Sequence, residues 1–189
     1  MCHKGLDRFL YDETPDVQLV AHAKAGDQRA LGELIARHEG VAFRVALSIL
    51  RDNDQAADAA QNGFIQAFRS IRRFRGESAF RTWLVTIVSN EARGLLRKRG
   101  RRPESALEFA PPVADPDRGP DERVVEDETA AWMKKVLEGL PEKQRLAVSL
   151  RVYDGMSFRE VGEAIGSSEG AARVNYHHGI RRLRELMEE

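Results

Sequence analysis

The chain has 189 residues, enough for one large domain or two small ones, and its 42% hydrophobic content can fill ordinary packed cores. The longest nearly apolar segment, residues 41–50, is interrupted by Arg44 and is too short to cross a bilayer. The first 13 residues contain no apolar stretch typical of a signal peptide. These features argue against membrane insertion and secretion, and we expect a globular protein of the cytoplasm.

The formal net charge is zero, but the charges are unevenly distributed along the chain. Residues 1–102 carry 18 Lys and Arg against 12 Asp and Glu, residues 103–130 carry 2 against 9, and residues 131–189 carry 10 against 9. Between Arg69 and Arg102 there are 11 basic residues and only two acidic ones. Such a local density attracts a polyanion in spite of the neutral total.

Residue types that carry out catalysis or bind metals do not occur in the usual patterns. The single cysteine, Cys2, permits no internal disulfide, and beside His3 it is more often a solvated end than a metal or redox site. We find no nucleophile–base pair, paired carboxylates, phosphate-binding loop or metal-ligand spacing. We therefore expect no catalytic residue, no metal and no cofactor.

Residues 14–102 show helical periodicity throughout. Thr14 is expected to cap a first helix that has Pro15 as its first residue and Gly26 as its stop. A second helix opens at Asp27. Its apolar residues recur at intervals of three and four and are Leu31, Leu34, Ile35, Val41, Ala42, Val45, Ile49 and Leu50.

Residues 51–55 end the second helix and cap a third. The apolar stripe of the third helix is expected to be Ala57, Ala60, Phe64, Ala67, Phe68 and Ile71. After a glycine-containing loop at residues 73–78, Ser78 can cap a fourth helix, which runs into the basic residues 93–102. Its core side chains are expected to be Phe80, Trp83, Leu84, Ile87 and Val88. Because no segment alternates polar and apolar residues as a strand would, we predict a compact all-helical domain over residues 1–102.

Residues 103–125 contain five of the seven prolines and a large acidic excess. This composition cannot build a hydrophobic core, and it predicts a flexible acidic linker. The linker leaves a second domain at residues 126–189.

The second domain shows the pattern of a helix-turn-helix motif. Pro141 starts a helix that the sequence at residues 153–157 breaks. Ser157 and Glu160 form a capping box for a short helix that ends at Gly166. A short helix, a tight turn and a longer basic helix together define the motif.

The last helix has two distinct faces. Its inner stripe is expected to be Ala172, Tyr176, Gly179, Leu183 and Leu186, which favours a core position for Tyr176 over a base contact. The opposite face carries Arg173, His177, Arg181 and Arg184, flanked by Val174 and His178. Adjacent histidines on a helix project about 100° apart, so His177 and His178 cannot share one metal ion. The outer face suits the major groove of DNA.

These two helical units, in this order, resemble an extracytoplasmic-function (ECF) sigma factor of bacterial RNA polymerase. Residues 31–102 are similar to the helical bundle of its domain 2, most specifically at FRGESAFRTWL, residues 74–84. Residues 140–185 are similar to its domain 4, which contains the helix-turn-helix. The resemblance implies an all-α protein of two domains joined by a flexible linker. It also implies a subunit that binds core polymerase, recognises the −10 and −35 promoter elements and promotes melting, without catalysing a reaction.

The resemblance further implies a contact between residues 54–68 and a coiled coil of the largest polymerase subunit, and a second contact with the polymerase flap. The polar contact positions are Asp58, Gln61, Asn62 and Gln66. This sequence departs from the family at Asn62, which is usually acidic, and at Ala59 and Ala60, which are usually larger. The alternative interpretation of this face is plain solvent surface.

Promoter contacts are implied for both domains. For the −10 element they are Arg75, Gly76, Glu77 and Ser78 in the loop, which captures an unstacked base, and Asn90, Arg93, Arg97 and Lys98 on the fourth helix. For the −35 element they are Ser168, Glu169, Arg173, Val174, His177, His178, Arg181 and Arg184. Departures from the family at Val174, Asn175 and His178 indicate an altered promoter preference.

The resemblance also implies control by an anti-sigma factor. Two other classes remain as alternatives: a stand-alone helix-turn-helix regulator and an enzyme. Whether Cys2, His3 or the two adjacent histidines sense a signal is open at this level.

Overall fold

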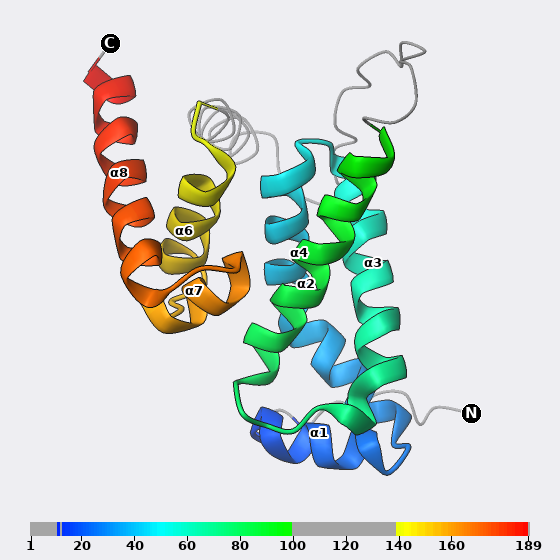
Figure 1. Ribbon diagram of the computed structural model, residues 1–189. Helices are drawn as coiled ribbons and strands as arrows, with labels where there is room; N and C mark the ends of the chain where they lie inside the picture. Colours follow the sequence, from blue (N-terminus) through cyan, green and yellow to red (C-terminus); the bar gives the residue numbers. More distant parts are fainter. Residues whose placement is uncertain (1–10, 12, 100–138, 189) are drawn as a thin grey trace, which may run out of the picture.

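The computed structural model describes residues 11, 13–99 and 139–188, and every regular element in these ranges is a helix. The expected linker at residues 103–125, the domain boundaries at 102 and 126, and Cys2 and His3 lie outside the described residues. The elements are α1 (Asp16–Lys24), α2 (Gln28–Leu50), α3 (Asn53–Ser70), the 3₁₀ helix η2 (Ile71–Arg73), α4 (Phe80–Arg99), α6 (Glu142–Val152), α7 (Phe158–Ile165) and α8 (Glu169–Glu188). Figure 1 shows α2, α3 and α4 as a bundle with α1 across one end, and α6, α7 and α8 as a second group beside it. The prediction of an all-α, two-domain protein is confirmed.

Local sequence sets most of the helix ends. The Asp27 carboxylate accepts hydrogen bonds from the backbone N–H groups of Arg29 and Ala30, and Asp52 caps α3 in the same way through Gln55. The capping box of Ser157 and Glu160 is present at the start of α7. These caps confirm the sequence predictions. They could be predicted because a cap depends on residues that are near neighbours in the chain.

Two predicted caps are wrong by one position. Pro15 rather than Thr14 occupies the N-cap of α1, with an extended backbone, so the helix begins at Asp16. α4 begins at Phe80, and the Ala79 carbonyl accepts the hydrogen bond of the Trp83 N–H. Ser78 therefore lies one residue too early to cap that helix.

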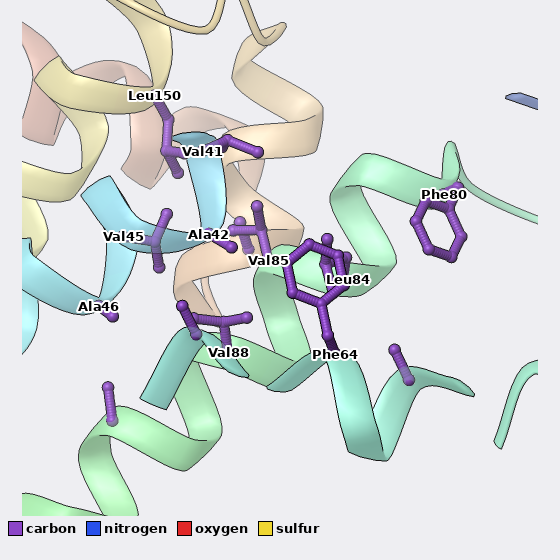
Figure 2. Close-up of a cluster of buried hydrophobic side chains, with 14 of the residues drawn as sticks. Val41, Ala42, Val45, Ala46, Phe64, Phe80, Leu84, Val85, Val88 and Leu150 are labelled. Atoms are coloured by element: carbon purple, nitrogen blue, oxygen red, sulfur yellow. The ribbon is translucent and has the colours of Figure 1, made fainter. Parts of the chain in front are cut away.

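The core of the first domain is formed by α2, α3 and α4. Figure 2 shows Val45 and Ala42 of α2 facing Val85 and Val88 of α4, with Phe64 of α3 beside them. Gly63 of α3 permits the close approach of α3 and α4, because a Cβ atom there would lie 2.5 Å from Cγ2 of Val88. An alanine at position 63 would force the two helices apart.

The predicted apolar stripes are wrong at two positions. Ile35 is exposed on α2, and Ala57 is exposed on α3 while Ala56 and Ala59 are buried. In an alanine-rich helix, neighbouring positions differ little in hydrophobicity, so the sequence pattern fixes the rotation of the helix poorly. Trp83 is half-buried and packs on Phe74, with ring centroids 4.8 Å apart, in agreement with its predicted place in the core.

The two domains pack against each other through a shared hydrophobic cluster. Leu146 and Leu150 of α6 are fully buried in the same cluster as Val41 of α2. Figure 2 shows Leu150 next to Val41. Nothing in the sequence predicted this contact, because it joins segments about a hundred residues apart.

Polar contacts surround this shared cluster. Arg145 is 4% exposed, and its guanidinium donates from Nε to the Ser48 carbonyl of α2 at 2.6 Å. Asp154 forms an ion pair with Arg44 of α2, and its carbonyl accepts a hydrogen bond from Arg81 of α4 at 2.7 Å. Further contacts from α4 to the second domain are Thr82 with Glu160 at 3.2 Å and Arg93 with Glu142 at 3.0 Å.

A hydrogen bond between α1 and α2 should make the free energy of unfolding depend on pH. The Asp16 carboxylate lies 2.7 Å from Nε2 of buried His38, and this hydrogen bond, opposed by burial and aided by Arg37, holds the pKa of Asp16 below its ordinary value. A lowered folded-state pKa contributes stability that is present above the unfolded-state pKa of about 4 and is lost as pH falls through the lower folded value. We expect Asp16→Asn to cost about 1 kcal/mol at pH 7 and progressively less below pH 4.

Urea unfolding of the wild type and Asp16→Asn between pH 3 and 7 measures this effect. Asp54→Asn, on an exposed carboxylate in the first turn of α3, is the control. A cost for Asp16→Asn that stays constant from pH 7 to pH 3 would contradict the assignment.

Candidate nucleic-acid and polymerase interfaces

One exposed face of α3 carries the predicted polymerase-contacting residues. Asp58, Gln61 and Asn62 are exposed and lie within one turn of one another. Gln66 follows one turn later, and its amide donates to Oε1 of Glu91 on α4 at 2.6 Å. The structure therefore brings the four residues together along one stretch of the helix surface.

The sequence analysis missed an apolar residue within this face. Ile65 is 42% exposed and lies three residues after Asn62. Ala59 and Ala60 are buried, so they contribute to the core and not to the surface. The α3 face is thus a set of polar side chains around one exposed isoleucine, the composition of a small protein-docking surface.

The centre of the loop before α4, residues 75–77, is exposed to solvent, whereas Ser78 is half-buried. Arg75 and Glu77 are exposed, and their nearest charged atoms lie 3.7 Å apart, so the two side chains constrain each other only weakly. Gly76 has φ +75°, a backbone conformation that favours glycine, although no atom lies within 4 Å of a Cβ built there. Glycine is therefore required by the turn and leaves open space beside it.

The predicted −10 residues of α4 form a row on the second half of that helix. Asn90, Arg97 and Lys98 are exposed, while Arg93 is half-buried and donates to Glu142 of α6. At 1.5 Å per residue, Asn90 lies about 15 Å along the helix axis from its first residue. The loop and the row thus lie toward opposite ends of α4, and Arg93 in the row is engaged by the second domain.

The predicted −35 residues lie at the start and along the outer face of α8. The Ser168 hydroxyl accepts a hydrogen bond from the Ala171 N–H at 3.2 Å, and Glu169 is the first helical residue. The exposed members of the outer face are Arg173, Val174, His177, His178, Arg181 and Arg184. The structure places all eight residues on one continuous surface.

The inner stripe of α8 is confirmed over most of its length. Ala172 is buried, and a Cβ atom at Gly179 would lie 2.6 Å from Cγ2 of Val148. Tyr176 is half-buried with its ring at 5.5 Å from that of Phe158. Leu186 is exposed, so the stripe ends before the position that the sequence predicted.

Phe158 and Arg151 were missed by the sequence analysis and lie beside the outer face of α8. The guanidinium carbons of Arg173 and Arg151 lie 4.7 and 4.9 Å from the centroid of the Phe158 ring. Arg173 also approaches Glu169 one turn earlier at 3.2 Å. The signal in the sequence that could have pointed to Phe158 is its place as an aromatic residue directly after the capping serine, Ser157.

Within the described ranges, no group of three or more His, Cys, Asp or Glu side chains is arranged to hold a metal ion. None of the described helices is long and apolar enough to cross a membrane.

Comparison with known proteins agrees with the geometry. The family described as Sigma-70 region 2 matches residues 34–102, and the family described as Sigma-70, region 4 matches residues 130–183. The chain is 33% identical over 187 residues to the RNA polymerase sigma-H factor of Pseudomonas aeruginosa, covering 95% of both chains. It is 31% identical over 189 residues to the ECF RNA polymerase sigma-E factor of Escherichia coli (strain K12), again covering 95% of both.

Two solved structures share the fold. CnrH, in a complex with the cytosolic domain of CnrY, superposes with a TM-score of 0.69 at 26% identity, covering 92% of this chain and 97% of that chain. The sigma factor RpoE of Bartonella quintana, in a complex with the anti-sigma factor NepR, gives a TM-score of 0.64 at 24% identity and covers 83% and 96%.

Proposed function

The chain belongs to the extracytoplasmic-function group of the sigma-70 family, and from this premise we propose how its two domains perform the work of a sigma factor. A sigma factor binds core RNA polymerase, recognises promoter elements and starts transcription. The observation that carries our assignment is the presence of exposed polar and basic residues on each domain, in the loop and on α4 in the first and along α8 in the second. The first domain would bind core polymerase and the −10 element, and the second the −35 element.

We assign the α3 face to the coiled coil of the largest polymerase subunit. Exposed Ile65 supplies an apolar anchor, and Asp58, Gln61 and Asn62 supply hydrogen-bonding groups around it. The flap of the polymerase would bind the second domain. Cytoplasmic location follows from these partners, and the chain itself need catalyse no step.

We assign the loop and the α4 row to the single-stranded −10 element. An unstacked base would lie in the open space beside Gly76, next to exposed Arg75 and Glu77. Arg97 and Lys98 would bind the phosphates. Binding the unpaired strand favours the melted state and so promotes melting.

The two domains must separate before both elements can be bound. The −10 and −35 elements lie about 25 base pairs apart, which is about 85 Å of B-form DNA. A compact chain of this length has a radius of gyration of only about 16 Å. The packed arrangement also engages Arg93 with Glu142, so opening would release a −10 contact.

We further propose an anti-sigma protein partner. CnrH, the structural relative at 26% identity, was solved with a protein bound, and the RpoE structure supports the same fold. Such a partner would cover the faces that bind polymerase.

Run-off transcription with reconstituted holoenzyme on a library of random promoters tests this function. We expect selected promoters to contain two separate elements, and Asn90→Ala to relax the preference at a −10 base, whereas Lys98→Ala should weaken all promoters alike. A chain that binds DNA without co-purifying with core polymerase would instead be a stand-alone regulator, and the proposal would fail.

A further inference from the structure

Phe158 is the centre of a cluster that touches the base-facing side of the helix-turn-helix. Its ring has the Arg173 guanidinium carbon at 4.7 Å from its centroid and the Tyr176 ring at 5.5 Å with an interplanar angle of 66°. The His177 ring lies 6.4 Å away. Three side chains within about one turn of α8 therefore lie around one side chain, that of the first residue of α7.

The backbone that carries Phe158 is held at both ends of α7. Ser157 immediately before it forms the capping box with Glu160, which sets the backbone at the start of α7. At Gly162 a Cβ atom would lie 2.9 Å from the Ser167 carbonyl oxygen, so α7 and the turn before α8 are in direct backbone contact. The ring is thus held on a rigid part of the fold, and not on a loop.

The arrangement leaves the functional edge of Arg173 available. The cation–π contact places the guanidinium carbon over the ring and uses none of the N–H groups of Arg173 as hydrogen-bond donors to another polar atom. Glu169 takes one of about five N–H donors at 3.2 Å. The remaining donors can still form the paired hydrogen bonds to N7 and O6 of guanine.

We propose that Phe158 is a positioning residue that determines −35 specificity by holding the Arg173 guanidinium for its base contact. This inference rests on the proposed −35 role of Arg173. An unsupported arginine side chain samples many rotamers and must lose that freedom on binding, whereas a supported one is already ordered. Phe158 therefore acts on one base pair through Arg173 and need not touch DNA itself.

The test uses the full-length chain and its holoenzyme with promoters that vary at one −35 base pair. An exposed cation–π contact corresponds to about a two- to fivefold change in binding. We expect Phe158→Leu and Phe158→Met to lower discrimination at the Arg173-dependent base pair by about this factor and to leave other base pairs unchanged. Phe158→Tyr keeps the ring and should retain wild-type discrimination. Adding Phe158→Leu to Arg173→Ala should cause no further loss.

A measurement without DNA detects the contact between the Phe158 ring and the Arg173 guanidinium directly. In NMR spectra of the free chain, the Arg173 Nε–Hε signal should be displaced by the ring current of Phe158, should move toward a free-arginine position in Phe158→Leu, and should stay in place in Phe158→Tyr. An unchanged signal in Phe158→Leu overturns the proposal.

Three DNA-binding outcomes also overturn it, and they differ in what they leave standing. Full discrimination in Phe158→Leu, with the NMR signal moved, removes the specificity role and leaves the sigma function intact. An equal loss for all promoters means that Phe158 serves only the fold. Full discrimination in Arg173→Ala removes the base contact itself, and two-element promoter selection by the wild-type holoenzyme then decides whether the proposed function survives.

Discussion

Arg145→Ala is expected to lower the free energy of unfolding by about 3 kcal/mol and to separate the two domains. The guanidinium is buried and donates to two carbonyl oxygens, Ser48 on α2 and Leu140 before α6, both at 2.6 Å. Hydrogen bonds from charged groups contribute about 1.5–3 kcal/mol each, and the alanine would leave both carbonyl groups without this donor. Because one of the two carbonyls belongs to the other domain, the loss falls on the contact between the domains as well as on α6.

Urea unfolding and small-angle X-ray scattering measure the two effects, and we expect the radius of gyration to rise in Arg145→Ala. Asp154→Asn is the matched control, because it removes the ion pair with Arg44 across the same contact and leaves the Ser48 and Leu140 carbonyl groups paired with Arg145. It should cause a smaller loss of stability and leave the radius of gyration closer to that of the wild type. Wild-type compactness in Arg145→Ala would show that the apolar cluster alone holds the domains together.

The helices and their caps could be predicted from the sequence because they depend on short-range patterns. Asp27, Asp52 and the Ser157–Glu160 pair each satisfy backbone donors within three residues of themselves. The rotation of α3 was predicted less well, since exposed Ala57 and buried Ala56 are chemically identical. The spacing of apolar residues predicts the buried face of a helix where neighbouring residues differ clearly in size or polarity, as on α8.

The contact between the domains could not be predicted in this way. Arg145 stands between a glutamine and a leucine in a helix and looks like an ordinary surface cation, yet it is among the most buried polar residues. Its partner Ser48 is 97 residues away in the chain, and only the fold brings the two together. The same holds for Arg93 with Glu142.

The exposure of most of the predicted DNA-contacting residues could be inferred from the sequence, but the contacts that support them could not. Exposure along α8 follows from helical periodicity, and the resemblance to sigma factors supplied the roles. The contact between Phe158 and Arg173 crosses from α7 to α8 and depends on the close approach of Gly162 in α7 to the backbone of the turn at Ser167. Sequence spacing within either helix contains no information about it.

The side chains of α8 should contribute unequally to promoter binding. Arg173 near the helix start is placed for a base edge, and Arg173→Ala should cost about 1–3 kcal/mol at one −35 base pair and relax the preference there. Arg181 is paired only loosely with Glu185, at 3.9 Å, and its side chain is 72% exposed. Together with exposed Arg184 it is placed for phosphates, so its loss should weaken binding to all sequences and reduce the log–log salt slope by about one.

Arg182 offers a matched control, because it is an exposed arginine of the same helix about 180° around the axis from Arg173. Holoenzyme binding of each alanine variant should be measured against a panel of −35 sequences at several salt concentrations, and Arg182→Ala should stay closest to the wild type. If Arg173→Ala weakened every sequence equally while Arg182→Ala changed the preference at one base pair, a different face of α8 would enter the groove, and the assignments of His177, Arg181 and Arg184 would have to rotate with it.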